Sequence, residues 1–341
     1  MDPRRVIFTT LLLPLVLLLS SQGAAQPVPV IFDTDMGNDV DDALALAMLH
    51  ALADRGEVEL LAVTLTKDNP YAATFVDVVN HFFGRPQTPI GMTRSGITAE
   101  TTDMIRIPSE RREQGDFVYV RAIDCAPCPP AVPLLRSVLA EAADSSVVMI
   151  QVGFSTNLAG LIASNPDELS PLTGRDLIAR KVRLLSIMAG DFAHALPGPE
   201  YNVDSDVASA HKLFAEWPVP IVASGFEIGE RILFPATSVE RDFGYVQHHP
   251  VADAYVHFLP MPYDRPTWDL TAVLVAVRPD EGYFNLSHPG QISVDDNGLT
   301  HFIRDEAGRH RYLKLESEAQ RQRALEAMRW LASQPPRTAV R

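Results

Sequence analysis

The chain has 341 residues, of which 46% are hydrophobic and 21% are charged. This length and composition exclude a small disulfide-stapled scaffold and a wholly disordered chain. A net charge of −14, from 29 basic and 43 acidic residues, also removes the electrostatic attraction on which nucleic-acid binding depends, so we expect no nucleic-acid partner.

The first 25 residues have the pattern of a secretory signal peptide. Arg4 and Arg5 precede an apolar run over residues 6–19, and small residues lead to Ala25, where cleavage would occur. The run is short for a membrane span, which makes an uncleaved anchor the weaker alternative. We therefore expect a secreted or periplasmic protein without membrane association after cleavage of the signal peptide over 1–25.

Buried strands and amphipathic helices alternate in the next part of the chain. The patterns predict strands over 28–34, 57–66, 88–92, 146–153, 181–189 and 218–223, and helices over 39–54, 71–83, 157–164 and 204–216. A polar, proline-containing stretch over 94–131 predicts a long loop or lid. This rhythm is typical of a parallel sheet with helices on both faces.

The last third of the chain is less regular. Residues 224–266 predict irregular structure with short helices, and a helix follows over 269–277. Strands predicted over 290–294, 299–304 and 310–315 suggest an antiparallel meander, which precedes a final helix over 317–331. We predict a single α/β domain over 26–333, with a mostly parallel, Rossmann-like sheet, a small antiparallel C-terminal meander and a frayed tail over 334–341.

The two cysteines, Cys125 and Cys128, form a Cys-Ala-Pro-Cys segment among prolines. No second pair accompanies them, which argues against structural zinc, and the prolines argue against the helix start that a thioredoxin-type motif needs. A local disulfide is the simplest expectation in an oxidising compartment.

Five carboxylates follow the first predicted strand within ten residues, at Asp33, Asp35, Asp39, Asp41 and Asp42. Ligands bind at the carboxyl ends of the strands in such sheets. Capping of the next helix explains one or two acidic residues, but five repel one another unless a cation such as Ca²⁺ or Mg²⁺ joins them. The EF-hand, Walker and dinucleotide-binding spacings all fail here, whereas a phosphatase-type Asp-x-Asp motif remains a competitor.

This acidic segment, Asp33-Thr-Asp35-(x)5-Asp41-Asp42, resembles the N-terminal signature of the inosine-uridine-type nucleoside hydrolases. Further segments resemble that family in the same order along the chain: Gly153 to Ala159, Met188 to Gly190, Glu200 to Asn202, and Trp268-Asp269. Together they span about residues 28–277. The resemblance implies a calcium-dependent enzyme that uses water to cleave the bond between ribose C1′ and a nucleobase.

The resemblance also implies roles for particular residues. It assigns the calcium ion to Asp35, Asp42, Asp269 and the backbone carbonyl of Thr156, and it makes Asp35 the general base. It assigns the ribose hydroxyls to Asp41, Asn69, Glu200 and Asn202. These roles agree with the chemistry, because carboxylates suit calcium and amides and carboxylates bind sugar hydroxyls.

The chain departs from the family pattern in three places. Two extra residues before the Asp-Asp pair make Asp39 a rival metal ligand, and Lys67 is an unexpected cation near the site. Trp268 replaces a histidine and resembles the purine-specific branch, in which an indole stacks on the base. A second aromatic face would come from Tyr71, Tyr201 or Phe226, and the alternative is that Trp268 is an ordinary core residue. If Trp268 is only a core residue, His248, His249 and His257 are the next candidates for the acid that protonates the leaving base.

We therefore expect an exported nucleoside hydrolase that prefers purine nucleosides. Members of the family that it resembles are often dimers or tetramers, so the resemblance is compatible with a homo-oligomer. Two alternatives stay open at this point. One is a metal-dependent phosphatase that uses the same carboxylates. The other is a calcium-stabilised nucleoside- or sugar-binding protein without catalysis.

Overall fold

The computed structural model describes residues 26–337 except for residue 96 and the segments 98–101 and 123–127. The predicted signal peptide, Cys125 and the last four residues therefore lie outside the described part of the chain. Within that part, no helix is both long enough and apolar enough to cross a membrane.

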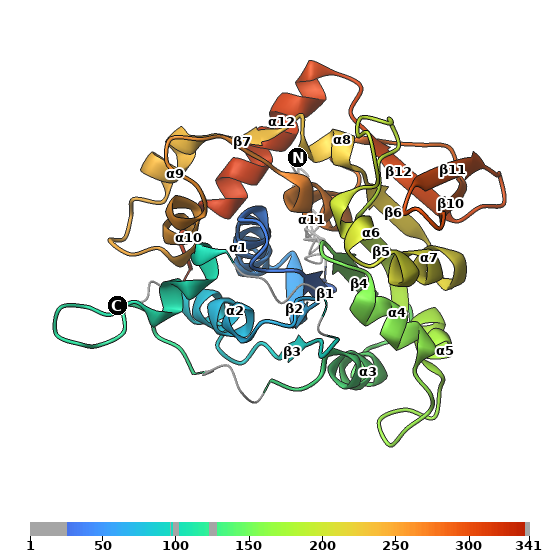
Figure 1. The fold of residues 1–341 in the computed structure, drawn as a ribbon, viewed down its shortest axis with the longest axis horizontal. Helices are drawn as coiled ribbons and strands as arrows, with labels where there is room; N and C mark the ends of the chain where they lie inside the picture. The colour runs from blue at the N-terminus through green and yellow to red at the C-terminus, as the bar shows by residue number, and fades with distance from the viewer. Residues whose placement is uncertain (1–25, 96, 98–101, 123–127, 338–341) are drawn as a thin grey trace, which may run out of the picture.

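One sheet of ten strands crosses the molecule (Figure 1). Its order is β11-β10-β12-β6-β5-β4-β1-β2-β3, with β9 paired to β12. The pairs from β3 to β12 are parallel, and β10 pairs antiparallel with both β11 and β12. The strands are β1 (Val28–Thr34), β2 (Val58–Leu65), β3 (Ile90–Met92), β4 (Val147–Gln151), β5 (Val182–Met188), β6 (Ile221–Ser224), β9 (Asn285–Leu286), β10 (Gly290–Val294), β11 (Thr300–Arg304) and β12 (His310–Lys314), while β7 (Leu233–Phe234) and β8 (Arg265–Pro266) form a separate pair.

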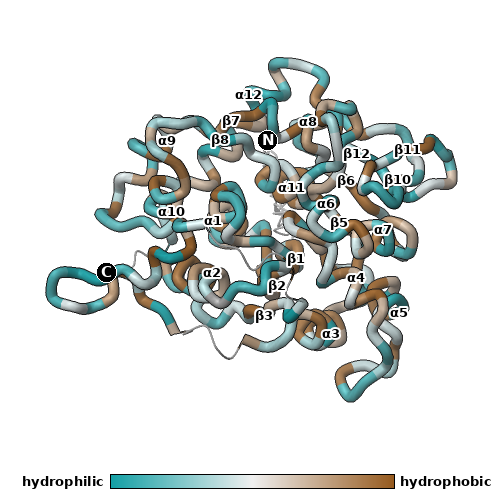
Figure 2. The backbone as a smooth tube through the Cα atoms, viewed as in Figure 1, coloured by the Kyte–Doolittle hydropathy of each residue, from teal (hydrophilic) through white to brown (hydrophobic). Residues whose placement is uncertain are grey.

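Helices cover both faces of the sheet, and each face has its own apolar core. One core contains α1 (Asp41–Asp54), α2 (Pro70–Phe82), α10 (Pro250–Phe258), α11 (Trp268–Val277) and α12 (Glu318–Ala332). The other contains α3 (Ala131–Glu141), α4 (Thr156–Ala163), α5 (Gly174–Lys181) and α7 (Val207–Glu216). Figure 2 shows hydrophobic residues gathered in these central elements and hydrophilic residues in the outer loops. The predicted fold class, a single α/β domain with a mostly parallel sheet, is confirmed.

Two helices, α1 and α11, are buried on almost every side, because α1 packs against β2, α11 and α12 while α11 packs against α1 and β5. Their sequences, rich in alanine, leucine and valine, satisfy contacts in all directions. Neither N-cap residue provides a side-chain hydrogen bond. The first turns instead carry acidic residues, which the positive end of the helix dipole favours. Their packing brings these two acidic N-termini together.

The structure contains several elements that the sequence patterns did not predict. The helices α3 and α5 were missed, and the predicted loop over 94–131 contains the 3₁₀ helix η1 (Asp103–Ser109). The segment 224–266 contains short helices, as predicted, namely α8 (Phe226–Gly229), α9 (Ala236–Asp242) and α10. The predicted helix over 204–216 is divided into α6 (Tyr201–Ser205) and α7, because Asp206 leaves helical geometry and caps α7 by accepting a hydrogen bond from the Ser209 N–H. Short or polar helices give weak periodic signals.

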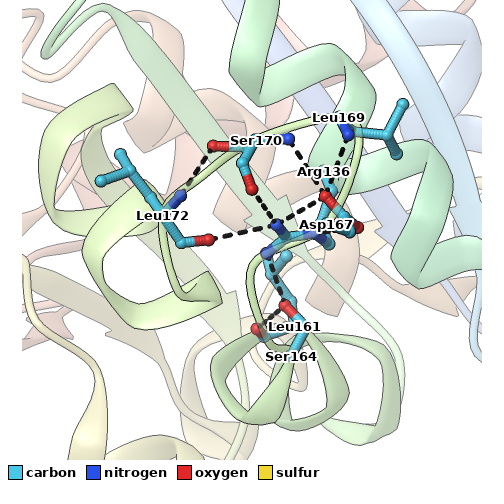
Figure 3. A network of polar contacts seen from close by, with 7 residues as sticks. All are labelled: Arg136, Leu161, Ser164, Asp167, Leu169, Ser170 and Leu172. Atoms are coloured by element: carbon cyan, nitrogen blue, oxygen red, sulfur yellow. Dashed lines mark hydrogen bonds and ion pairs between the residues drawn. The ribbon is translucent and has the colours of Figure 1, made fainter.

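The loop between α4 and α5 is fixed by one arginine (Figure 3). Arg136 from α3 is almost fully buried and donates to Asp167 through Nε and Nη2, at 2.7 and 2.8 Å. It also donates to the backbone carbonyls of Ser170 and Leu172 and to the Ser164 hydroxyl. The guanidinium lowers the pKa of Asp167 to about 2, so this ion pair persists across the physiological pH range.

The described part of the predicted frayed tail is in contact with the domain. The Arg337 backbone N–H donates to the Asp54 carboxylate at 2.8 Å, and its guanidinium donates to the Asp54 carbonyl. Arg337 therefore contacts the end of α1, and residues 338–341 of the predicted tail lie outside the described part of the chain.

Candidate active site

A pocket of about 460 Å³ opens at the carboxyl ends of the central strands. Its residues come from the loop after β1, from the ends of β4 and β5, from α6, and from the starts of α8 and α11. The location agrees with the rule that ligands bind at this edge of a parallel sheet. The lining residues are Asp35, Gly37, Asn38, Asp39, Asp41, Asp42, Thr102, Val152, Met188, Glu200, Tyr201, Asn202, Phe226, Phe258, Arg265, Trp268 and Asp269.

Two glycines allow the backbone to form this pocket. Gly37 has φ +112°, a conformation that other residues rarely adopt, and it lets the chain turn between Asp35 and α1. Gly153 follows β4, and a Cβ atom there would lie 2.4 Å from the backbone nitrogen of Asp35. The ends of β1 and β4 can approach each other this closely only because Gly153 has no side chain.

Three carboxylates converge at the N-termini of α1 and α11. Asp41, Asp42 and Asp269 each offer an oxygen within 4.8 Å of the others, and all three are buried. The Asp269 N–H donates to Asp41 at 3.1 Å, and the Thr34 hydroxyl donates to Asp42. Burial, together with the neighbouring carboxylates, raises the pKa of all three groups well above its usual range.

This donor set fits a hard divalent cation. Carboxylate oxygens are the preferred ligands of Ca²⁺, and a bound cation would offset the repulsion among the three groups. The set differs from the predicted one in its third carboxylate. Asp41, which the resemblance assigned to the ribose, belongs to the converging group. Asp35, which it assigned to the metal, lines the same pocket beside that group.

Asp35, the predicted general base, is 4% exposed and lies in the pocket. The Asn38 amide donates to its Oδ2 atom, and the Lys67 ammonium donates in turn to the Asn38 carbonyl oxygen. Burial raises the pKa of Asp35 to about 6, although the Asn38 hydrogen bond and the Lys67 charge oppose this rise. Lys67 thus lowers the pKa of Asp35 by its charge and also donates to Asn38, which holds the Asp35 carboxylate.

Asp33 lies behind the pocket and is not part of its lining. Its Oδ1 atom accepts hydrogen bonds from the Thr64 hydroxyl and the Asn157 amide, and burial raises its pKa to about 7. These contacts connect β1 to β2 and α4. Asp33 therefore supports the site from the side of the sheet.

Asp39, the rival metal ligand, is engaged elsewhere. Its two carboxylate oxygens accept hydrogen bonds from Nε and Nη2 of Arg265, and Oδ1 also accepts from the Val40 N–H. The ion pair joins the turn after β1 to β8. Both carboxylate oxygens of Asp39 are paired with Arg265. Asp39 is not one of the three converging carboxylates.

Glu200, the N-cap residue of α6, and Asn202, in its first turn, both line the pocket. Glu200 caps this helix by accepting hydrogen bonds from the Asn202 and Val203 N–H groups, and it also accepts from the Gly190 N–H at 3.1 Å. Burial raises its pKa to about 7. The Asn202 amide donates to the Val152 and Met188 carbonyls, which fixes its orientation at the ends of β4 and β5.

Thr156, predicted to offer its backbone carbonyl to the metal, and Asn69, predicted to bind the ribose, are not among the residues that line the pocket. Thr156 already belongs to α4, and its hydroxyl donates to Asp206 at 2.6 Å. Val152, which directly follows β4, lines the pocket in its place. Asn69 caps α2 by accepting a hydrogen bond from the Tyr71 N–H at 3.0 Å. Helix capping therefore accounts for this asparagine.

Trp268 lines the pocket and is half-buried. Its indole N–H donates to the Phe226 carbonyl at 2.9 Å, and its ring stacks on the Phe226 ring with centroids 5.4 Å apart. A base held between two rings needs their centroids about 7 Å apart, so Phe226 supports Trp268 and does not form an opposite face. Of the other predicted aromatic partners, Tyr201 lines the pocket and Tyr71 does not.

The three candidate histidines are absent from the described pocket lining. His249 is buried, caps α10, and has its pKa lowered to about 3 by burial, so its ring is neutral at physiological pH. His257 faces Glu110 at 3.1 Å, and His248 faces Asp253 at 3.6 Å. All three therefore have structural partners away from the carboxylates.

Several pocket residues were missed from the sequence, namely Asn38, Thr102, Val152, Met188, Phe258 and Arg265. Three of them, Val152, Met188 and Phe258, are apolar, and an apolar side chain by itself does not mark a binding site. Arg265 is different, because it lies only three residues before Trp268 in the segment Asp-Arg-Pro-Thr-Trp-Asp. A basic residue so close to an expected substrate contact was a usable signal.

The fold and the pocket define an α/β protein with an acidic, carboxylate-lined site at the carboxyl edge of its sheet. The model of the family described as inosine-uridine preferring nucleoside hydrolase matches residues 30–324. The chain belongs to this family.

Named relatives are similar to this chain at low sequence identity. The pyrimidine-specific ribonucleoside hydrolase RihA of Klebsiella pneumoniae is 28% identical over 220 residues, which cover 63% of this chain and 65% of that protein, just under two thirds. The purine-preferring ribonucleoside hydrolase from Gardnerella vaginalis has 18% identity and a TM-score of 0.65, covering 89% of this chain and 99% of that one. The inosine-uridine preferring nucleoside hydrolase from Bacillus anthracis has 18% identity and a TM-score of 0.66, covering 90% and 99%. These two structural likenesses establish the shared fold.

Proposed function

We propose that this protein is an exported, calcium-dependent N-ribohydrolase, which converts ribonucleosides to free base and ribose and prefers purines. The observation that carries the proposal is the convergence of Asp41, Asp42 and Asp269 in one pocket with Asp35 and Asn202. Family membership supports the reaction class. The predicted signal peptide supports export.

The converging carboxylates of Asp41, Asp42 and Asp269 would hold the calcium ion, beside Asp35 and the backbone at Val152. When bound, calcium supplies a positive centre that orients the ribose hydroxyls and the attacking water and lowers the pKa of that water.

Asp35 accepts the proton of the attacking water as its oxygen bonds to C1′. Asn38 holds the Asp35 carboxylate through one oxygen, which leaves the other available for the water. Glu200 and Asn202, which line the same pocket, bind ribose hydroxyls and keep C1′ in line with the water. The surrounding carboxylates stabilise the positive charge that develops on the sugar in an oxocarbenium-like transition state.

A nucleoside panel with and without a chelator tests this function. We expect free ribose to be released from ribonucleosides in the presence of calcium, with loss of activity in EDTA and recovery on adding calcium back. Turnover of phosphate esters without turnover of nucleosides would favour a phosphatase. Calcium-dependent binding of nucleosides without ribose release would favour a binding protein, and either result would reject the proposal.

The proposed purine preference depends on the aromatic side of the pocket. Trp268, Phe226, Phe258 and Tyr201 line it, and a purine offers a larger π-face to these rings than a pyrimidine does. The named relatives include both purine-preferring and pyrimidine-specific enzymes, so the preference has to be argued from this pocket. Stacking contributes about 0.5–1.5 kcal/mol, which corresponds to at most about a tenfold preference.

Replacement of Trp268 by alanine is expected to reduce the advantage of purine ribosides over uridine and cytidine, by up to about tenfold. If stacking also eases departure of the purine, its effect appears in the transition state, so the loss should fall mainly on kcat. Steady-state kinetics with inosine and uridine measure both parameters.

Trp330→Ala is the matched control, because Trp330 is 54% exposed on α12 and lies outside the pocket lining. Circular dichroism confirms that each variant is folded. A wild-type protein that prefers uridine, or a Trp268→Ala variant with unchanged kcat for inosine, would make Trp268 a packing residue only.

A further inference from the structure

Arg265 is the one basic residue among the described residues that line the pocket. Its guanidinium lies 5.3 Å from the Trp268 ring centroid and 5.1 Å from the Phe258 ring centroid. One side of the guanidinium, formed by Nε and Nη2, is paired with Asp39. The structure records no hydrogen bond from Nη1 to any residue of the described chain, so the Nη1–Nη2 end retains N–H donors.

The arrangement of charge in the pocket gives a nucleoside one orientation. Ribose hydroxyls are hydrogen-bond donors and bind where the carboxylates gather, around Asp41, Asp42 and Asp269. The base then extends toward the aromatic side of the pocket, where Arg265 lies beside Trp268. There the guanidinium faces the acceptor atoms of the base.

We propose that Arg265 binds the nucleobase and selects 6-oxopurines, that is, the bases of inosine and guanosine. The inference rests on the proposed function and names its substrate class. A guanidinium fork pairs with two neighbouring acceptors, and a 6-oxopurine presents O6 and N7 side by side. Adenine places an amino donor at position 6, which faces the N–H groups of the arginine. Uracil presents O4 next to a C–H group and so offers one acceptor.

The same contact stabilises the leaving group. As the C1′–N9 bond breaks, its electron pair stays on the purine, and the negative charge spreads to O6 and N7. Hydrogen bonds from a fixed cation strengthen as this charge develops. The water oxygen bonds to C1′ and its proton passes to Asp35, which returns it to solvent. The released purine anion takes a proton from solvent. Asp39 is a positioning residue in this scheme, because it holds the guanidinium without touching the base.

The test uses three ribosides and the variant Arg265→Met. Inosine needs help for its leaving base, adenosine lacks the matched acceptor pair, and p-nitrophenyl β-D-riboside releases an anion that is stable without help. We expect kcat/KM for inosine to fall about tenfold to a hundredfold, with much smaller changes for the other two substrates. Arg265→Lys keeps the charge and loses the fork, so it should also lose the preference for inosine over adenosine.

Two controls separate this role from a structural one. The double variant Asp39→Asn/Arg265→Met removes the unpaired carboxylate that the single variant leaves behind, and it should show the same substrate pattern. Arg304→Met is the second control. Arg304 lies on the edge strand β11, is paired with Glu306 and does not line the pocket. This variant should leave the rates for all three ribosides unchanged. Equal losses on all three ribosides would overturn the proposal and make Arg265 a positioning residue only.

Calorimetric titration with free hypoxanthine and free adenine tests the contact without turnover. We expect the wild-type protein to bind hypoxanthine more tightly than adenine and Arg265→Met to bind both bases equally. Equal affinities in the wild-type protein would overturn the inference. If the wild-type protein binds hypoxanthine selectively but releases no ribose from any nucleoside, the proposed function fails while the base-binding role of Arg265 stands.

Discussion

Replacement of Asp35 by alanine is expected to lower kcat for nucleoside hydrolysis by about 10²–10⁴-fold, the range typical of a lost general base. Asp35 is the carboxylate best placed for this role, because it lines the pocket and Asn38 holds one of its oxygens. The two neighbouring alternatives are otherwise engaged, since Asp33 lies behind the pocket and Asp39 is paired with Arg265. Steady-state kinetics at saturating nucleoside and calcium measure the loss.

Asp35→Asn is the matched variant, because it keeps the size of the side chain and an oxygen that can accept the Asn38 hydrogen bond. Calcium titration followed by thermal unfolding separates loss of the base from loss of the metal. We expect Asp35→Asn to retain a calcium-dependent rise in Tm while kcat falls by orders of magnitude. Turnover within threefold of the wild type in both variants would show that another group accepts the proton.

The sequence predicted the sheet and the acidic site well, because both depend on local patterns. Strand β1 was predicted with its observed bounds, and the burst of carboxylates after it marked the carboxyl edge of the sheet. Asp42 and Asp269 were predicted as neighbours although 227 positions separate them. That prediction came from the family resemblance, since no local pattern connects the N-termini of α1 and α11.

Residues whose role depends on backbone placement were harder to predict. Thr156 was chosen for a backbone carbonyl, which no side chain reveals, and the position that lines the pocket is Val152 at the end of β4. Asn69 has a residue type suited to sugar hydroxyls and also to helix capping, and its position before α2 fits the second role. Arg265 was missed although it lies three residues before Trp268, and its pairing with Asp39, 226 residues away, could not be predicted. An ion pair of that separation leaves no trace in a single sequence.

Removal of calcium is expected to destabilise the protein strongly and in a pH-dependent way. A ligand that binds only the folded state at 100 times its Kd adds about 2.7 kcal/mol to the free energy of unfolding, and chelation removes this contribution. Without a cation, burial raises the pKa of Asp35 to about 6 and that of Asp33 to about 7, well above the usual range of an aspartate. Burial and the neighbouring carboxylates also raise the pKa values of Asp41, Asp42 and Asp269.

The sign of the pH effect follows from these shifts. The folded, calcium-free protein binds more protons than the unfolded chain between about pH 4 and pH 7, so its free energy of unfolding falls as the pH rises through this window. We therefore expect Tm in EDTA to be lower at pH 8 than at pH 5. The rise in Tm on adding calcium should be larger at pH 8, where the carboxylates are ionised and bind the cation without first losing protons. Differential scanning fluorimetry at both values measures the two effects.

Asp42→Asn tests whether the three converging carboxylates cause this behaviour. The asparagine keeps an oxygen that can accept the Thr34 hydrogen bond but removes one negative charge from the cluster. We expect this variant to need at least tenfold more calcium for half-maximal stabilisation, and to be more stable than the wild type in EDTA at pH 8, because one repulsive charge is gone. Asp280→Asn, an exposed change after α11, is the matched control and should behave as the wild type does. If chelated wild-type protein melts at the same temperature at both pH values and still hydrolyses nucleosides, the carboxylate cluster is not a calcium site.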